Sequence, residues 1–515
     1  MSKVPAFVEL KADGVQLIVS LTSGTPVVLH WGADLGIALD FEQLNLAAQE
    51  AVPHADLDDH INPGLWREDA RGFHGRPALQ GHRNGQDWSQ LFEIDTVVSD
   101  ATSIVITSVD RAAQLEISAT FTISASGILS ITQSVKNVAG KDFSLNELTT
   151  WLPLADYATE TMDFTGRWVK ERQPQRREIQ VGTWSREIRE GRSGHDYTIV
   201  QLAMTKDANY QRGEVWSMGL QWSGNTRHLV EKMNTGRAAI GTGELLLPGE
   251  VILAAGETYV APTVVSAYSN EGIDGITDRH YRWLRARPSH PSIVRPRPLT
   301  LNVWEAVYFD HNLEKLTQLA DVAQSIGVER FVLDDGWFGA RRNDLRGLGD
   351  WVVSKDVWPN GLKPLIDVVK SRGMEFGLWF EGEMVNPDSD LYRAHPEWIL
   401  HVGDRTPPEG RFQQVLDLTH PGAFEHVLGQ VDAVLSEYDI AYIKWDHNRT
   451  LTDAAHFGQA AVRNQTKAIY ALFDELKKRH PGLEIESCSS GGGRIDLGMV
   501  DHADRFWTSD CNDAL

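Results

Sequence analysis

The chain has 515 residues, of which 42% are hydrophobic and 23% charged, as in a soluble globular protein of two to three domains. Its formal net charge of −22 at pH 7 disfavours nucleic acids and anionic membranes as partners. With two cysteines, no apolar run near the roughly 20 residues of a membrane helix and no apolar signal-peptide core, the sequence predicts a cytoplasmic protein without a disulfide framework.

Residues 1–290 contain short alternating segments separated by turn residues, for example 15–19, 103–107 and 127–132. Alternation with a period of two at this density predicts antiparallel strands. Because helical signals are few, we predict an N-terminal β-sandwich domain. A proline-rich stretch around residues 288–298 predicts the domain boundary, which we place between residues 290 and 291.

From residue 299 the pattern changes to strands that alternate with helices. Apolar strands are expected at 301–304, 331–333, 376–380, 442–445, 483–486 and 506–507, and helices at 313–326, 362–372, 424–434 and 462–479. This alternation predicts a (β/α)₈ barrel over residues 291–515. A doubly wound open sheet is the alternative, but no glycine-rich phosphate loop follows the first strand.

The predicted barrel stops after its sixth strand, because the chain ends five residues after Asp510. Two barrel strands are therefore expected to be absent from this sequence. Either the chain is a fragment, or sequence from elsewhere completes the barrel.

Two carboxylates end nearby strands on the expected catalytic face of this barrel. Lys444 and Asp446 are two apart on one strand, so both point to one face, where the cation favours an ionised nucleophile; the alternative is a structural ion pair. Asp510 follows Trp507, and these aromatic surroundings suit a general acid, unless Asp510 caps a helix. Such a pair of carboxylates suits glycoside hydrolysis.

Other polar clusters also follow strands. Asp334 and Asp335 are adjacent acids that sugar hydroxyls or a divalent metal could satisfy, unless they lie in a solvated loop. Trp379 begins a similar polar cluster at the end of the third strand. Arg411 alone is weak evidence for a binding site, since arginines on loops are usually solvated. A glycine-rich segment at 487–494 could bring backbone amides close to a ligand or merely form a tight turn, and it lacks the spacing of a phosphate loop.

Six ordered motifs resemble those of the glycoside hydrolase family 36 α-galactosidases. They are WEAVYF at 304–309, VLDDGWFG at 332–339, LWFEGEMV at 378–385, KWDHNR at 444–449, CSSGGG at 488–493 and WTSDCNDA at 507–514. The β-rich N-terminal half agrees in architecture, although its motifs are less specific.

The resemblance implies a retaining exo-hydrolase that removes terminal α-galactosyl units from oligosaccharides such as melibiose and raffinose, through a covalent galactosyl-enzyme and without a metal or cofactor. It implies Asp446 as the nucleophile and Asp510 as the acid/base. Asp334 and Asp335 would bind the 4- and 6-hydroxyls of galactose. The other residues implied to surround the sugar are Trp379, Arg411, Lys444, Cys488 and Gly491. Members typically continue into a C-terminal β-domain and often form tetramers, so we expect a homo-oligomer.

Two departures from the family pattern are present. Gly382 stands where members usually carry proline. Residues 72–83 depart from a Gly-Asp-Phe-Arg form that in some members reaches a neighbouring subunit's pocket. We therefore do not predict this contact between subunits for the present chain. α-N-Acetylgalactosaminidases and transgalactosylases share much of the apparatus. A metal-dependent lyase or isomerase barrel and a catalytically silent sugar-binding protein are the alternatives from other classes.

Overall fold

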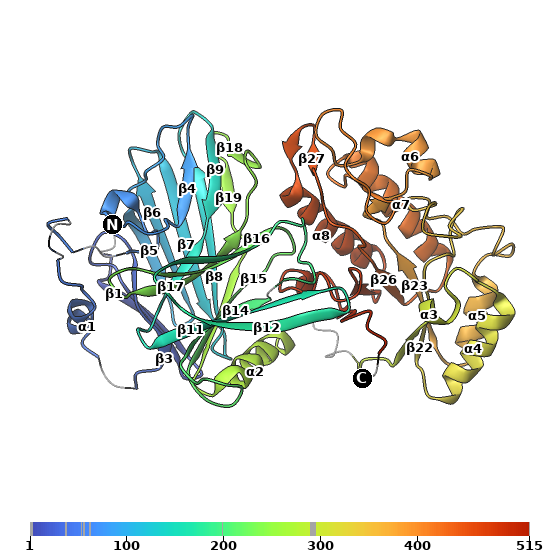
Figure 1. Ribbon diagram of the computed structural model, residues 1–515, viewed down its shortest axis with the longest axis horizontal. Helices are drawn as coiled ribbons and strands as arrows, with labels where there is room; N and C mark the ends of the chain where they lie inside the picture. The colour runs from blue at the N-terminus through green and yellow to red at the C-terminus, as the bar shows by residue number, and fades with distance from the viewer. Residues whose placement is uncertain are drawn as a thin grey trace. The chain divides into compact units, whose positions relative to one another are not determined.

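The computed structural model describes residues 4–36, 39–52, 54, 57–60, 63–197, 199–288 and 295–513 (Figure 1). The chain divides into two compact units: unit 1 holds residues 1–165, 172–189 and 198–288, and unit 2 holds residues 166–171, 190–197 and 289–515. The boundary predicted at 290/291, like the last residue of the sixth motif, lies outside the described residues. In the described ranges no helix is both long and apolar enough to cross a membrane.

Unit 1 consists mainly of antiparallel sheets, which confirms the predicted β-sandwich. The largest has the order β12-β11-β14-β15-β20-β8-β7-β6-β5, with β19 paired to β8. Its strands are β5 (Glu93–Ser99), β6 (Ser103–Asp110), β7 (Leu115–Ile123), β8 (Leu129–Asn137), β11 (Ala158–Arg167), β12 (Lys170–Glu178), β14 (Val200–Thr205), β15 (Val215–Leu220), β19 (Thr258–Val260) and β20 (Val264–Ser269). Along β7, residues alternate between the core and the outer face, as a strand with one buried face requires.

Smaller sheets pack against this large sheet, and β15 contacts β17 across the sandwich. The first of these sheets contains β10 (Thr150–Leu154), β17 (Ala238–Glu244), β16 (Thr226–Lys232) and β13 (Gly182–Ile188). The second contains β18 (Val251–Leu253), β9 (Phe143–Leu148) and β4 (Leu79–His82). The third contains β1 (Phe7–Ala12), β2 (Val15–Ser20) and β3 (Val27–Ala33). The helices described in unit 1 are α1 (Phe41–Ala47), α2 (Gly272–Arg285) and the 3₁₀ turn η1 (Asp69–Arg71).

Unit 2 is built on a parallel sheet with the order β21-β22-β23-β26-β29-β30. The strands are β21 (Thr300–Asn302), β22 (Arg330–Leu333), β23 (Glu375–Phe380), β26 (Tyr442–Trp445), β29 (Glu484–Ser487) and β30 (Arg505–Phe506). Each overlaps a strand expected from the sequence. The sequential order with helical crossovers is that of a (β/α) barrel, which confirms the predicted fold class.

Four longer helices connect these strands: α4 (Leu313–Ser325), α5 (Lys363–Ser371), α7 (Pro421–Glu437) and α8 (Val462–Arg479). Figure 1 shows α4 beside α5, and α4 contacts α5 as α7 contacts α8. Helix α4 begins where the Asn312 side chain accepts the amide hydrogen of Lys315, and its buried face includes Leu316 and Ala320. Gly327, at φ +83°, follows its end, as expected for a left-handed helix stop.

Shorter elements decorate the loops of unit 2. They are α3 (Trp304–Val307), α6 (Asp390–Ala394), β24 (Met384–Val385), β25 (Gln414–Val415), β27 (Ala455–His456), β28 (Gln459–Ala460) and the 3₁₀ turns η3 (Pro396–Trp398) and η4 (Met499–Asp501).

A buried ion cluster ties together the amino-terminal ends of the parallel strands. Arg330 opens β22 and is fully buried. It donates to Glu375 at the start of β23 (2.8 Å) and to Glu484 at the start of β29 (2.9 Å). Burial acts to raise the pKa of Glu484, but Arg330 and Arg295 outweigh it and lower that pKa to about 2. Since β22 and β29 are not neighbours in the sheet, this contact shows how strongly the sheet curls.

Candidate active site

A cavity of about 610 Å³ lies in unit 2 at the carboxyl ends of the parallel strands. The residues predicted for a site that line it are Asp334, Asp335, Trp379, Arg411, Lys444, Asp446 and Asp510. Further lining residues, to which the sequence assigned no role, are Trp168, Val169, His195, Trp304, Glu305, Asn448 and Ser490. The structure therefore brings together most of the predicted site and adds a group from the N-terminal half of the sequence.

Asp446 directly follows β26 and is buried. Its Oδ2 accepts hydrogen bonds from Asn448 Nδ2 (2.8 Å) and Trp379 Nε1 (3.3 Å), and its Oδ1 accepts one from the backbone amide of His447 (2.9 Å). Burial alone would raise the pKa of Asp446, but Lys444 and the Asn448 hydrogen bond outweigh it, so that the pKa lies below its usual value. An ionised carboxylate held in one orientation has the properties of a nucleophile.

The adjacent acids of the second strand are neutralised by side chains of the protein. Asp334 Oδ2 accepts from Lys444 Nζ at 3.0 Å and from Asn302 Nδ2 at 2.5 Å. Asp335 is bound by Arg341, whose Nε and guanidinium NH₂ lie 3.0 and 2.7 Å from its two oxygens. Burial lowers the pKa of Lys444, yet the negative charge of Asp334 more than compensates and leaves that pKa well above its usual value. Both acids are thus buried, paired and fixed in place.

Asp510 lies beyond the end of β30 and is half-buried. Its Oδ1 accepts a hydrogen bond from Trp507 Nε1 (3.0 Å) and its Oδ2 accepts one from Trp168 Nε1 (2.9 Å). In the described residues, which stop at 513, no helix begins at Asp510. Because only three described residues follow Asp510, the alternative that this residue caps a helix stays a prediction.

Cys488 and Gly491 lie next to the lining residues rather than among them. Cys488 is buried after β29, and its amide donates to the carbonyl oxygen of Trp445 (2.8 Å). Gly491 has φ +79°, and a Cβ placed on it would lie 2.6 Å from the backbone nitrogen of Asp510. Gly491 is therefore a position where only a missing side chain lets the loop that carries Asp510 come so close.

Two segments that precede the barrel in sequence anchor its loops. Glu171 Oε2 accepts a hydrogen bond from Ser509 Oγ at 2.9 Å. His195 Nε2 donates to the carbonyl oxygen of Ser490 at 2.6 Å. Both segments, 166–171 and 190–197, belong to unit 2. The site thus includes groups that are more than 290 residues distant in sequence from their partners.

Comparisons with known proteins place the chain in a family. The Melibiase family model matches residues 258–515, and that of the glycosyl hydrolase family 36 N-terminal domain matches residues 24–254. The α-galactosidase of Escherichia coli is 40% identical over 488 residues, which cover 95% of this chain and 69% of that protein. The chain belongs to glycoside hydrolase family 36.

Other family 36 proteins agree with this assignment. α-Galactosidase AgaA of Geobacillus stearothermophilus is 38% identical over 370 residues, which cover 70% of this chain and 50% of that protein. Its family 36 crystal structure superposes with a TM-score of 0.91 and 30% identity over 99% of this chain and 76% of that chain. In sequence alignments the matched region covers about half the length of AgaA and of the bifunctional α-galactosidase/sucrose kinase AgaSK of Mediterraneibacter gnavus.

The two departures from the family 36 pattern have a clear structural setting. A Cβ on Gly382 would lie 2.5 Å from the Trp445 ring, so glycine leaves room for that indole. In the 72–83 stretch, Arg76 Nε donates to Glu147 Oε1 at 3.0 Å within unit 1. Neither position carries a residue of the predicted site.

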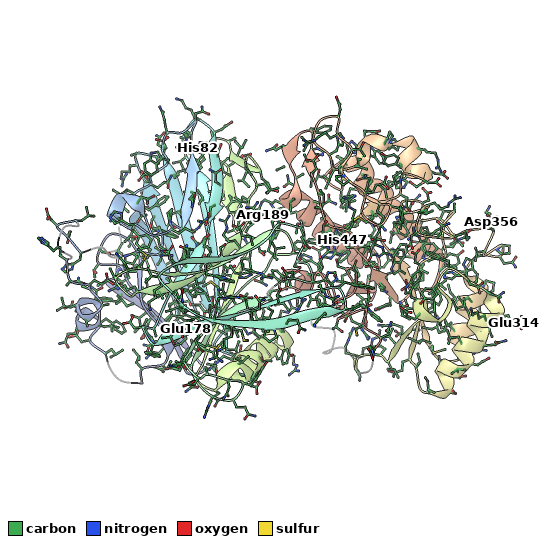
Figure 2. The ribbon with its side chains drawn as sticks, in the orientation of Figure 1. His82, Glu178, Arg189, Glu314, Asp356 and His447 are labelled. Carbon is green, nitrogen blue, oxygen red and sulfur yellow. The ribbon has the colours of Figure 1, made fainter. Side chains whose placement is uncertain are left out.

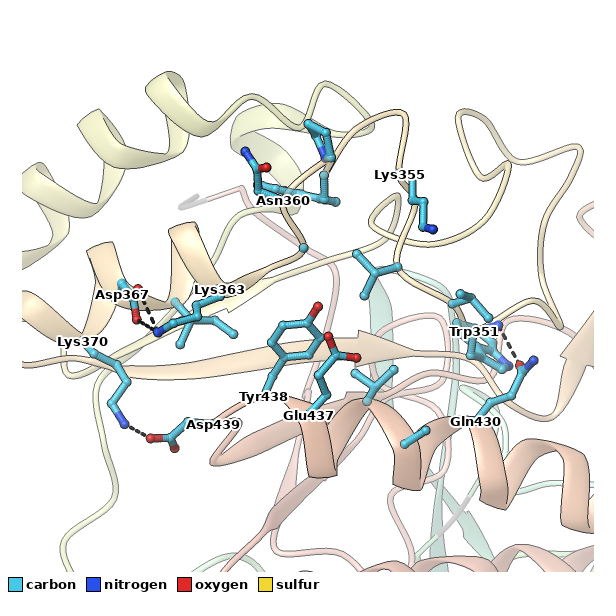
Figure 3. Close-up of a pocket in the computed structure, with 18 residues that line it drawn as sticks. Trp351, Lys355, Asn360, Lys363, Asp367, Lys370, Gln430, Glu437, Tyr438 and Asp439 are labelled. Atoms are coloured by element: carbon cyan, nitrogen blue, oxygen red, sulfur yellow. Dashed lines mark hydrogen bonds and ion pairs between the residues drawn. The ribbon is translucent and has the colours of Figure 1, made fainter.

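Other features of unit 2 lack the chemistry of this cavity. A cavity of about 1010 Å³ lies between α5 and α7 rather than at strand ends, and two of its acids pair with Lys363 and Lys370 (Figure 3). Among side chains drawn in Figure 2, Glu314 and Asp356 lie on the outer surface, whereas His447 is buried next to Asp446. In the described part of the chain, no group of three His, Cys, Asp or Glu residues could hold a metal ion. The expected independence from metals stays a prediction.

Proposed function

We propose that this chain carries the active site of a retaining exo-α-galactosidase that acts on oligosaccharides. The observation that carries the proposal is the shared cavity, in which the ionised nucleophile Asp446 and the half-buried Asp510 end two strands of one barrel. The family supports it, because relatives are named α-galactosidases. Crystal structures of AgaA variants contain raffinose or stachyose, which are the type of substrate we propose here.

The reaction follows from the roles of the two carboxylates. In the first step an oxygen of Asp446 attacks the anomeric carbon, the glycosidic bond breaks, and the proton of Asp510 passes to the leaving oxygen. In the second step water attacks the anomeric carbon, gives its proton to Asp510 and releases Asp446. Each step inverts the anomeric carbon, so the product keeps the α-configuration. The two carboxyl groups should accordingly lie about 5 to 5.5 Å apart.

Recognition of galactose is assigned to the remaining pocket residues. Asp334 and Asp335 retain acceptor capacity on Oδ1 after their bonds within the protein, so they can accept hydrogen bonds from the 4- and 6-hydroxyls. Lys444 and Arg411 contact the neighbouring hydroxyls, and Trp379 lines the pocket. Because buried acceptors left unpaired are costly, α-glucosides, which differ at the 4-hydroxyl, should be much poorer substrates.

Kinetics with three variants tests the catalytic roles. Asp446→Asn should abolish turnover of 4-nitrophenyl α-galactoside without unfolding the chain, since the nucleophile is lost. Asp510→Ala should slow melibiose far more than the aryl galactoside, whose departure needs little protonation. The exposed Asp356 provides a control, Asp356→Asn, with normal kinetics. Near-normal kcat in folded Asp446→Asn, or β-galactose as the first product in proton NMR, would contradict the mechanism.

A substrate panel separates this proposal from the alternatives. Faster cleavage of 2-acetamido substrates would indicate an α-N-acetylgalactosaminidase, and preferred transfer to a sugar acceptor a transgalactosylase. Loss of activity with a chelator would favour a metal-dependent enzyme. Binding of galactosides without hydrolysis would indicate a sugar-binding protein.

We further propose that the protein is cytoplasmic and homo-oligomeric. Cys488 and Cys511 are both free thiols, which suits a reducing compartment. The family resemblance supports a tetramer. Cell fractionation tests the location, and light scattering coupled to size-exclusion chromatography tests the assembly.

A further inference from the structure

The two oxygens of Asp510 are each held by an indole. Trp507 is three residues away in sequence and contacts Oδ1, whereas Trp168 is 342 residues away and contacts Oδ2 at 2.9 Å. Both donors are side-chain N–H groups, so replacing either tryptophan can remove its hydrogen bond. The orientation of Asp510 therefore depends on the identity of these two side chains.

Trp168 occupies an unusual turn. With Val169 it forms the two-residue tip between β11 and β12. The indole is 56% exposed, although large apolar side chains are usually buried. Val169 has φ +54°, a left-handed conformation that is strained for a β-branched residue and that glycine or asparagine normally occupies in turns. A turn that merely connected two strands would need neither residue.

The position of this tip is fixed by a second contact. Glu171 follows the turn closely, and its Oε2 accepts the hydroxyl hydrogen of Ser509, the residue before Asp510. The tip therefore binds the loop of the acid/base at two adjacent residues. Both Trp168 and Val169 also line the catalytic cavity.

We infer that Trp168 is a positioning residue for the general acid, a role that rests on the proposed function. When Asp510 gives its proton to the leaving oxygen, it becomes a carboxylate, and a donor on each oxygen stabilises that charge and fixes the plane of the carboxyl group. The same donors hold Asp510 while it takes a proton from water in the second step. Without Trp168, only Oδ1 keeps its donor, so the carboxyl group can rotate.

Two substitutions separate the N–H of Trp168 from its ring. Trp168→Phe keeps an aromatic ring and removes the donor, whereas Trp168→Ala removes both. The control is Trp88→Phe, since Trp88 is a similarly exposed tryptophan of unit 1. Each variant is assayed on melibiose, whose leaving group needs protonation, and on 4-nitrophenyl α-galactoside, whose leaving group does not. The parameter kcat/KM is compared because it reports the step in which the glycosidic bond breaks.

Trp168→Phe should lower kcat/KM on melibiose about tenfold, mainly through kcat, because one of two hydrogen bonds to an ionised group is lost. On the aryl galactoside the decrease should stay below about threefold. Trp88→Phe should match the wild type on both substrates.

Three results would overturn the inference. An equal loss of kcat/KM on both substrates would mean general damage to the fold, and a wild-type kcat/KM of Trp168→Phe on both substrates would mean that the hydrogen bond has no role in proton transfer. An increase of KM for melibiose in Trp168→Ala, with normal Trp168→Phe, would make the ring a platform for the leaving sugar instead. A wild-type chain that hydrolyses neither substrate would contradict the proposed function itself, whereas an active wild type with an unaltered variant would contradict only the role of Trp168.

Discussion

Glu381 is a buried acid beside the nucleophile, and its replacement by glutamine should change how stability depends on pH. It follows β23 and is 1% exposed. Burial is the main cause that raises the pKa of Glu381, the negative charge of Asp446 adds to it, and the resulting pKa is about 8. Its Oε1 accepts the amide hydrogen of Asn448 at 2.6 Å, and its Oε2 lies 3.3 Å from Gln413 Nε2. At neutral pH Glu381 is therefore a protonated, uncharged acid.

The sign and size of the effect follow from this raised pKa. In the unfolded chain Glu381 titrates near 4.5, so from there to about pH 8 the unfolded state gives up a proton that the folded state keeps. The free energy of unfolding therefore falls as pH rises through this window. At about 1.4 kcal/mol for each pH unit, the loss reaches about 5 kcal/mol at pH 8 and is absent below pH 4.

Glu381→Gln should remove most of this loss because an amide does not titrate. The side-chain carbonyl oxygen of the new glutamine can accept the hydrogen bond from the Asn448 amide. Its NH₂ group can donate to Gln413 Oε1, a buried atom without a partner among the described residues, once the Gln413 amide turns over.

Urea unfolding followed by tryptophan fluorescence at pH 5 and pH 8 measures the difference. The variant should gain several kcal/mol over the wild type at pH 8 and less than about 1 kcal/mol at pH 5. Glu425→Gln, which removes an exposed carboxylate of α7, controls for the loss of one acidic side chain. A gain of equal size at both pH values, or a loss that grows with pH, would refute the reasoning.

Three further predictions concern the cavity and the base of the barrel. Gly491→Ala places a Cβ 2.6 Å from the Asp510 nitrogen, so kcat/KM on melibiose should fall by about tenfold or more while the melting temperature changes little; a larger effect on the aryl galactoside would contradict this. Lys444→Met removes the cation that lowers the pKa of Asp446 in spite of burial, so the acidic limb of the pH profile of kcat/KM should move to higher pH. An acidic limb at the wild-type pH would disprove that Lys444 controls the pKa of Asp446. Arg330→Met removes the fully buried cation of the cluster and leaves Glu375 and Glu484 paired only with Arg295 and Arg297, so the free energy of unfolding should fall by about 3 kcal/mol in urea titrations, whereas kcat of the folded variant should not change.

The sequence predicted best those features that depend on neighbouring residues. Apolar runs located β26 and β29, and the end of α4 at Gly327 followed from a single glycine. The strand-end position of Asp446 and Asp510 could also be predicted, because every parallel strand of a barrel ends on the same face.

Long-range partners could not be predicted in this way. Asp334 and Asp335 were expected to need neutralisation, but nothing local indicated that Arg341 and Lys444 supply it. Trp168 lies in a β-rich region with no motif, and its contact with Asp510 exists only after folding. The one local signal was the valine that follows it in a tight turn, where glycine or asparagine is usual.

The discontinuity of unit 2 has a consequence for the order in which the chain is made. Translation reaches Trp168 first and Asp510 342 residues later, a delay of roughly 20 to 70 s at typical rates of synthesis. In the last part of that interval, once Asp446 has been made, the hairpin tip and the nucleophile strand already exist, but the acid does not. A ribosome-bound chain that ends between Asp446 and Asp510 therefore holds a nucleophile without its proton donor, and hydrolysis can begin only after the later-made part has met the earlier one.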